Sequence, residues 1–235
     1  MSELFQHGTL ALLVPGLLEG TISIQDVLKH GDTGIGTGQG LDGELIVLDG
    51  TAYQVNGEGK VTVVNDTDFK LPFCDVHFAE FKPLKAVEKL KMRDVEKTVF
   101  ADVDYRNIFF GLKMTGNFSK VKARSVNKQD KPYPSLTQTA DQQSVFNHED
   151  INGTIIGYYS PHIFNGPAVG GFHLHFISED KTVGGHLLDF ELAAGKISLQ
   201  PFETLTQHFP VDNQEFMSHD FEKDDIASAI DYAEK

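Results

Sequence analysis

Short runs rich in hydrophobic residues, separated by small polar turns, make up most of this chain. Residues 44–48, 51–55 and 60–64 are three such runs in close succession, and Asp-Gly and Asn-Gly pairs separate them. These dipeptides between apolar runs are typical of tight turns that join antiparallel strands. The pattern therefore predicts a β-meander in this part of the chain.

Further short apolar runs bounded by turn residues follow along the rest of the sequence. They predict strands at residues 76–81, 107–114, 118–126, 152–159, 169–177, 185–192 and 196–200, with a hairpin turn at Gly116-Asn117. Helical spacing predicts helices at residues 10–18, 23–30, 84–100 and 224–234, with Ser23 as the cap of the second. The polar stretch at residues 127–147 is interpreted as a linker or a long functional loop.

Strands thus outnumber helices, and most connections are too short for the crossovers that parallel strands require. This balance favours an α+β fold with largely antiparallel or mixed sheets. A chain of 235 residues can form one large or two small domains.

Composition narrows the possible partners and the compartment. A formal net charge of −14 argues against nucleic acid or an anionic membrane as a partner, because phosphate binding needs clustered Lys and Arg. Cys74 is the single cysteine, so no intramolecular disulfide can form and a reducing cytoplasm is expected. The apolar run at residues 10–18 lacks the flanking features of a signal peptide and is too short to span a bilayer.

The glycine-rich segment at residues 34–40 matches neither of the common nucleotide-binding patterns. A predicted helix, rather than a strand, precedes it. We interpret this segment as a mobile loop or a loop that lies close to a ligand.

Three histidines carry the most specific chemical signal. His173 and His175 lie two residues apart in a predicted strand, so their side chains share one face. A polar turn at residues 178–184 leads into the next strand, and one register of this hairpin places His186 opposite them. A lone strand histidine is usually structural, but three imidazoles with open positions are typical of a catalytic zinc site.

The sequence around these histidines resembles the metal motif of the alpha-acetolactate decarboxylase family. The resemblance rests on residues 172–177 and 184–186, and it extends to the amino-terminal segments 31–37 and 41–46. Further similar blocks lie at residues 72–74, 106–107, 131–133 and 152–157. Gly38-Gln39 departs from the Phe-Asn that the family pattern leads us to expect.

The resemblance implies the conversion of 2-acetolactate to acetoin and carbon dioxide, with a zinc ion on His173, His175 and His186. It also implies catalytic roles for Arg124 and for two acidic residues, Glu44 and Glu234. The sequence does not divide the work between the two glutamates.

The implied architecture is a homodimer of two-domain α/β subunits. A mixed amino-terminal sheet would occupy residues 1–150. A smaller, mostly antiparallel carboxy-terminal sheet at residues 151–235 would carry the metal hairpin and a closing helix.

Two other interpretations stay open at this point. His173 and His175 followed by Glu179 resemble the start of a cupin motif, which suggests a cupin-like metal-dependent enzyme acting on a small hydroxy or keto acid. A non-catalytic binding module is the other, although it leaves the histidine hairpin unexplained. Imidazole ligands also suit iron, copper and nickel, so the sequence does not fix the native metal.

Overall fold

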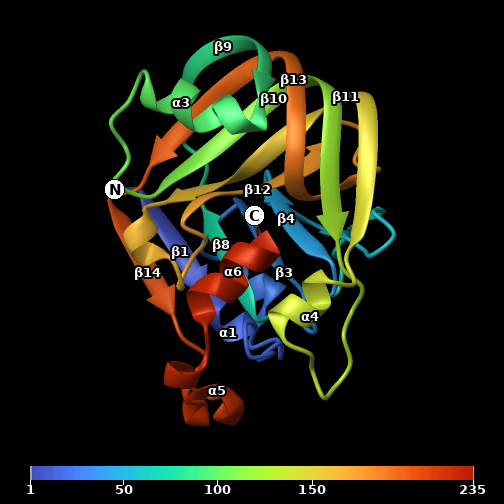
Figure 1. Ribbon diagram of the computed structural model, residues 1–235, viewed down its shortest axis with the longest axis vertical. Coiled ribbons are helices and arrows are strands. Elements are labelled where there is room, and N and C mark those ends of the chain that lie inside the picture. The colour runs from blue at the N-terminus through green and yellow to red at the C-terminus, as the bar shows by residue number, and fades with distance from the viewer. Residues whose placement is uncertain (1, 235) are drawn as a thin grey trace.

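A mixed sheet of seven strands forms one layer of the protein (Figure 1). The computed structural model describes residues 2–234. The strand order of this sheet is β14 (Thr204–His208), β1 (Glu3–His7), β8 (Phe73–His77), β3 (Thr33–Thr37), β4 (Glu44–Leu48), β5 (Thr51–Val55) and β6 (Val61–Val63). β14 pairs with β1 in parallel, and the other neighbours are antiparallel. The meander predicted from the Asp-Gly and Asn-Gly turns is confirmed as β4, β5 and β6.

An antiparallel sheet of five longer strands forms the second layer. Its order is β10 (Phe110–Ser125), β11 (Ser144–Ser160), β12 (Gly171–Ser178), β13 (Gly184–Pro201) and β9 (Lys82–Lys91). β10 also pairs with β13, so four of the strands close on themselves. A two-stranded sheet of β2 (Ile22–Ser23) and β7 (Lys70–Leu71) completes the α+β fold.

The helices are short. They are α1 (Leu10–Leu13), α2 (Ile24–Val27), α3 (Val95–Phe100), α4 (Leu136–Ala140), α5 (Gln214–Ser218) and α6 (Ile226–Glu234), with 3₁₀ turns η1 (Met92–Asp94), η2 (His162–Phe164) and η3 (Phe221–Lys223). Ser23 caps α2 as predicted, because its side chain accepts a hydrogen bond from the backbone N–H of Asp26. No helix in the described part of the chain is long and apolar enough to cross a membrane.

The helix predicted at residues 84–100 was wrong for residues 84–91, which belong to the edge strand β9, whereas residues 92–94 form η1 and residues 95–100 form α3. Ile197 of β13 pairs with Lys85 of β9, and the next residue of β13, Ser198, pairs with Pro83. Leu84 is therefore an extra residue in β9. Such a bulge changes the side-chain alternation. The resulting three-residue spacing of Leu84 and Val87 imitated a helical pattern.

The hairpin predicted at Gly116-Asn117 was also wrong, since β10 continues straight through these residues. Gly116 pairs with Gly153 on one side and with Gly195 on the other. A Cβ atom at Gly116 would lie only 2.2 Å from the carbonyl oxygen of Ala194. These glycines therefore allow close packing of neighbouring strands instead of turning the chain.

Four further predictions need correction. Residues 185–192 and 196–200 belong to one strand, β13, and the strand predicted at 76–81 lies at Phe73–His77. The polar stretch at residues 127–147 contains α4 and the start of β11. Most of the glycine-rich segment predicted to be a loop at residues 34–40 belongs to β3.

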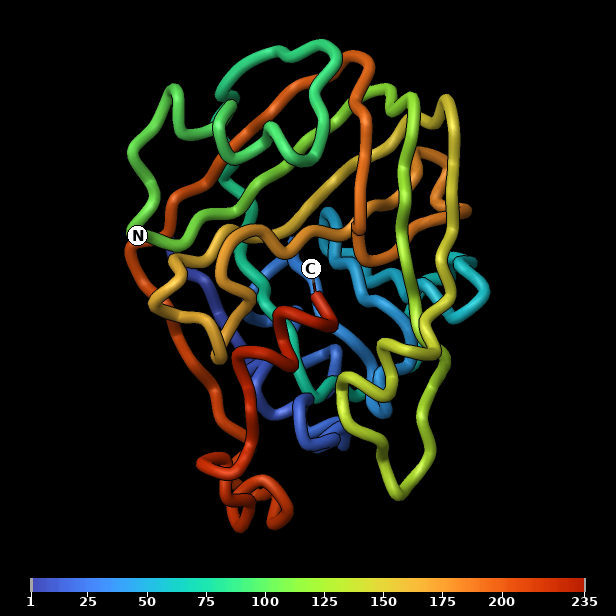
Figure 2. The backbone as a smooth tube through the Cα atoms, in the orientation of Figure 1, coloured from blue at the N-terminus to red at the C-terminus, as the bar shows by residue number. Residues whose placement is uncertain are grey.

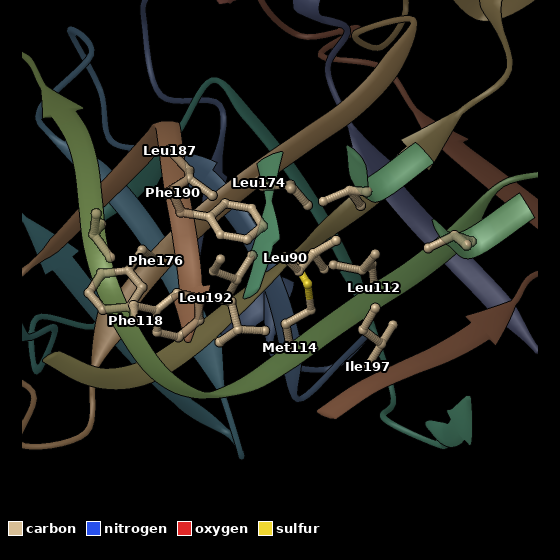
Figure 3. Close-up of a cluster of buried hydrophobic side chains, with 14 of the residues drawn as sticks. Leu90, Leu112, Met114, Phe118, Leu174, Phe176, Leu187, Phe190, Leu192 and Ile197 are labelled. Atoms are coloured by element: carbon tan, nitrogen blue, oxygen red, sulfur yellow. The ribbon is translucent and has the colours of Figure 1, made fainter. Parts of the chain in front are cut away.

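Two clusters of buried side chains matter for the site. One lies inside the five-stranded sheet, four strands of which close on themselves, and contains Leu112, Phe118, Phe176, Phe190 and their neighbours (Figure 3). The other packs α1, α4 and α6 together. The division into residues 1–150 and 151–235 stays a prediction, and residue 150 itself lies within β11.

Candidate functional site

The hairpin of β12 and β13 brings the three predicted histidines together. His175 pairs directly with His186 across the two strands, which confirms the register expected from the sequence. His173 projects from the same face of β12. Ligand nitrogens of the three side chains all lie within 4.8 Å of one another, and all three residues are buried.

The protonation of these histidines suits a metal ion. Burial lowers the pKa of His173, His175 and His186, so the imidazoles are neutral near pH 7. Nδ1 of His175 lies 3.0 Å from the carbonyl oxygen of Leu45. A proton on Nδ1 is donated to that carbonyl, which leaves a lone pair on Nε2 for a metal.

Two buried nitrogens at the centre of the triad lack protein partners. Nε2 of His175 and Nδ1 of His186 have no hydrogen-bond partner among the described residues. An unpaired buried polar atom is costly, because it loses its contact with water without compensation. Three neutral imidazoles with two such nitrogens are therefore a donor set that fits zinc.

Arg124 lies beside the triad and joins the two predicted glutamates. Its Nη1 donates to Oε1 of Glu44 across 3.1 Å, and its Nη2 donates to Oε1 of Glu234 across 3.2 Å. Nη2 also lies 3.1 Å from the carbonyl oxygen of Ala233. The planar guanidinium thus fixes the relative positions of two carboxylates that are 190 residues apart in the sequence.

The second oxygen of each carboxylate faces the histidines. Oε2 of Glu44 lies 3.4 Å from Nε2 of His175. Oε2 of Glu234 lies 3.4 Å from Nε2 of His173 and 3.5 Å from Nδ1 of His186. Since the imidazoles are neutral, these contacts are not ion pairs, and both carboxylates border the space that the three nitrogens share.

Burial also changes the acidity of Glu44. It raises the pKa of this carboxyl to about 7, although the charge of Arg124 acts in the opposite direction. A carboxyl group with such a pKa is partly protonated near neutral pH, so it can donate as well as accept a proton.

The remaining walls of the pocket are mostly apolar. Leu13, Leu41, Phe73, Val126 and Leu136 are among the side chains that line it together with the polar cluster. Gly36 and Thr37 of β3 also line the pocket, so part of the glycine-rich segment does lie at the site. The arrangement suits a small molecule that carries polar oxygens on one side and alkyl groups on the other.

The structure brings all six sequence-predicted residues into this one pocket. Glu179, on which the cupin-like alternative depended, is exposed and lies outside the metal group. Sequence reasoning missed the carbonyl of Leu45, which leaves no signal in the sequence, and it missed α4, whose residues 136–140 were interpreted as loop.

A family model and two named relatives match almost the whole of this chain. Residues 4–223 match the family model described as alpha-acetolactate decarboxylase. The alpha-acetolactate decarboxylase of Lactococcus lactis subsp. cremoris is 40% identical, over 100% of this chain and 99% of that protein. The enzyme of the same name from Bacillus licheniformis is 36% identical, over 100% of this chain and 92% of that protein.

Solved structures agree with this match. The crystal structure of alpha-acetolactate decarboxylase from Bacillus subtilis strain 168 superimposes with a TM-score of 0.93 at 33% identity, covering 99% of each chain. A Staphylococcus aureus protein of unknown function, described as similar to alpha-acetolactate decarboxylase, gives a TM-score of 0.92 at 38% identity. That match covers 99% of this chain and 100% of the other.

Proposed function

The chain belongs to the alpha-acetolactate decarboxylase family of carboxy-lyases, and on this premise we propose that its reaction depends on zinc held by His173, His175 and His186. The observation that carries the proposal is the grouping of three buried, neutral imidazoles whose ligand nitrogens lie within 4.8 Å. Two carboxylates and one guanidinium face the same space.

The chemistry explains why these groups belong together. When the carbon–carbon bond to the carboxylate of 2-acetolactate breaks, carbon dioxide leaves and an electron pair stays behind. This pair moves into the neighbouring carbonyl group and gives an enediolate. His173, His175 and His186 would hold the zinc ion, which would supply a Lewis acid that stabilises the developing negative charge.

A proton must then reach one carbon of the enediolate to give acetoin. We assign this donation to a glutamic acid, and Glu44 is the first candidate because burial raises its pKa to about 7. Glu234 is the second candidate, since its Oε2 borders the same space. The apolar wall of the pocket accommodates the two methyl groups of the substrate and keeps bulk water away.

Arg124 has a positioning role in this proposal. Tight binding of the departing carboxylate would stabilise the ground state and slow the reaction. Both terminal nitrogens of Arg124 already bind Glu44 and Glu234, whereas its Nε has no hydrogen-bond partner among the described residues. Arg124 therefore orients the two glutamates and keeps one donor for a substrate oxygen.

The proposal is tested with the purified protein and 2-acetolactate. Acetoin should form, a strong chelator should abolish its formation, and zinc should restore it. Acetoin production that continues at the full rate after complete metal removal would contradict the metal-dependent mechanism.

Two further properties belong to the same proposal. We expect a homodimer, as the family resemblance implies, and light scattering on the purified protein checks this. We also expect a reducing cytoplasm as the compartment, and the single, buried and free thiol of Cys74 is compatible with it.

A further inference from the structure

Helix α6 forms one wall of the pocket. Its Ile230 and Ala233 are buried in the apolar cluster that includes residues of α1 and α4. The backbone trace in Figure 2 shows this helix, in red, beside the yellow-green segment that contains α4. Glu234 at its last turn reaches the histidine triad, so the placement of this turn decides where the carboxylate lies.

Helix α4 offers a firm support for α6. Ser135 caps it, and a reciprocal pair of hydrogen bonds between Ser135 and Gln138 fixes its first turn. Leu136, Thr139 and Ala140 of α4 line the same pocket. The helix is thus defined locally by its own sequence and borders the site directly.

A side-chain hydrogen bond connects the two helices at the protein surface. The hydroxyl of Tyr232 donates to Oδ1 of Asp141 across 2.5 Å. Asp141 ends α4, and Tyr232 lies two residues before Glu234. Tyr232 is 62% exposed, so hydrophobic burial does not account for its position.

The location of this bond matters because of helix geometry. Successive residues of an α-helix are turned by about 100°, so residues 232 and 234 lie about 200° apart around the axis. Tyr232 therefore faces outward while Glu234 faces the site. The apolar contacts of Ile230 and Ala233 are not directional, and the directional bonds from Arg124 to the Ala233 carbonyl and to Glu234 lie on the inner side of the helix only. A roll of the helix about its axis would displace Glu234 from the triad. A directional bond on the outer face opposes that roll.

We infer that Tyr232 and Asp141 are positioning residues for the decarboxylation, because their hydrogen bond fixes the last turn of α6 against α4 and so holds Glu234 at the histidine triad. This inference rests on the proposed function of the pocket. It makes neither residue a catalytic group, since both lie at the surface and act through Glu234.

The test compares Tyr232→Phe, Asp141→Asn and the double variant with the wild type. A net contribution of one hydrogen bond corresponds to roughly a three- to tenfold effect. We expect kcat to fall by that factor in each single variant while KM stays within about twofold, because the residues that face the substrate are unchanged. The double variant should be no slower than the slower single variant, since both changes remove the same bond.

A second readout does not depend on activity. Amide hydrogen exchange at residues 226–234 should become faster by a similar factor in each variant, with little change in the melting temperature. Tyr53→Phe is the matched control, because it removes a hydroxyl from a tyrosine whose ring contacts Lys181 far from α6 in the sequence. This control should change neither the rate nor the exchange.

The outcomes separate the two claims. Variants that keep kcat within twofold of an active wild type, or losses that multiply in the double variant, overturn the positioning role alone. Unchanged amide exchange at residues 226–234 also overturns it. A metal-loaded wild type that makes no acetoin overturns the proposed function, and the catalytic role of this bond with it.

Discussion

Replacing Glu44 with glutamine removes a titratable proton from the site and preserves the shape of the side chain. The amide oxygen of glutamine can still accept the hydrogen bond that Nη1 of Arg124 donates to Oε1 across 3.1 Å. The histidines are placed by β12 and β13, and the carbonyl of Leu45 orients His175. We therefore expect the Glu44→Gln variant to fold and to bind metal normally.

The expected loss is kinetic. Burial raises the pKa of Glu44 to about 7, so the carboxyl group is partly protonated at neutral pH and can donate its proton. A positioned proton donor contributes roughly 10²- to 10⁴-fold to a rate, which corresponds to about 3–5 kcal/mol of activation free energy. We expect kcat of Glu44→Gln to fall by roughly 10²-fold or more, with a smaller change in KM.

The assay follows acetoin formed from 2-acetolactate at saturating substrate, with metal content and melting temperature measured on the same samples. Glu44→Asp separates reach from ionisation, because it keeps the carboxyl group but withdraws it by about 1.5 Å. Such a displacement should also slow turnover strongly. Glu58→Gln, at an exposed position on the surface, is the matched control and should keep the full rate.

A near-normal kcat in a Glu44→Gln variant with full metal content would refute the reasoning. It would show that another group delivers the proton, and Glu234 would be the next residue to test.

Other predictions follow from the same contacts. Arg124→Lys should lower kcat more than it weakens substrate binding, because an ammonium group cannot bridge both glutamates in the same plane, and a change confined to KM would contradict this. Glu234→Gln should reproduce most of the loss in turnover caused by deleting residues 231–235, with metal content nearly unchanged in both, and a truncated enzyme that works at the full rate would remove Glu234 from the catalytic residues. Burial raises the pKa of Asp75 from 3.8 to about 7, so between these values the folded state binds more protons than the unfolded state and the contribution of this residue to stability declines as the pH rises. The stability of Asp75→Asn relative to the wild type should therefore rise between pH 4 and pH 7, by roughly 3 kcal/mol. Equal pH profiles from denaturant titrations would contradict this.

The histidine hairpin was predictable because its signal is local. The two-residue spacing of His173 and His175 fixes a common face, and the short polar turn limits the registers that can place His186 opposite them. Glu44, Arg124 and Glu234 have no comparable local signal. They meet only because β4, β10 and α6 converge on the hairpin, so their assignment depended on the family resemblance.

Failures of the sequence interpretation also have physical causes. Gly116 was interpreted as a turn residue, although it allows a neighbouring backbone to approach in the middle of a long strand. The bulge at Leu84 produced a helical spacing within an edge strand. In both cases long-range strand pairing overrides the local pattern, and a single sequence does not contain that information.

The dependence of the reaction on the metal is tested by measuring acetoin formation and metal content on one preparation while the metal is removed stepwise. We expect about one metal ion per chain in the active enzyme and a rate of acetoin formation that falls in proportion to the metal removed. His175→Ala should lack most of both metal and activity. Full acetoin production by metal-free protein, or full metal occupancy without His173, His175 or His186, would contradict a reaction that depends on a metal held by these histidines.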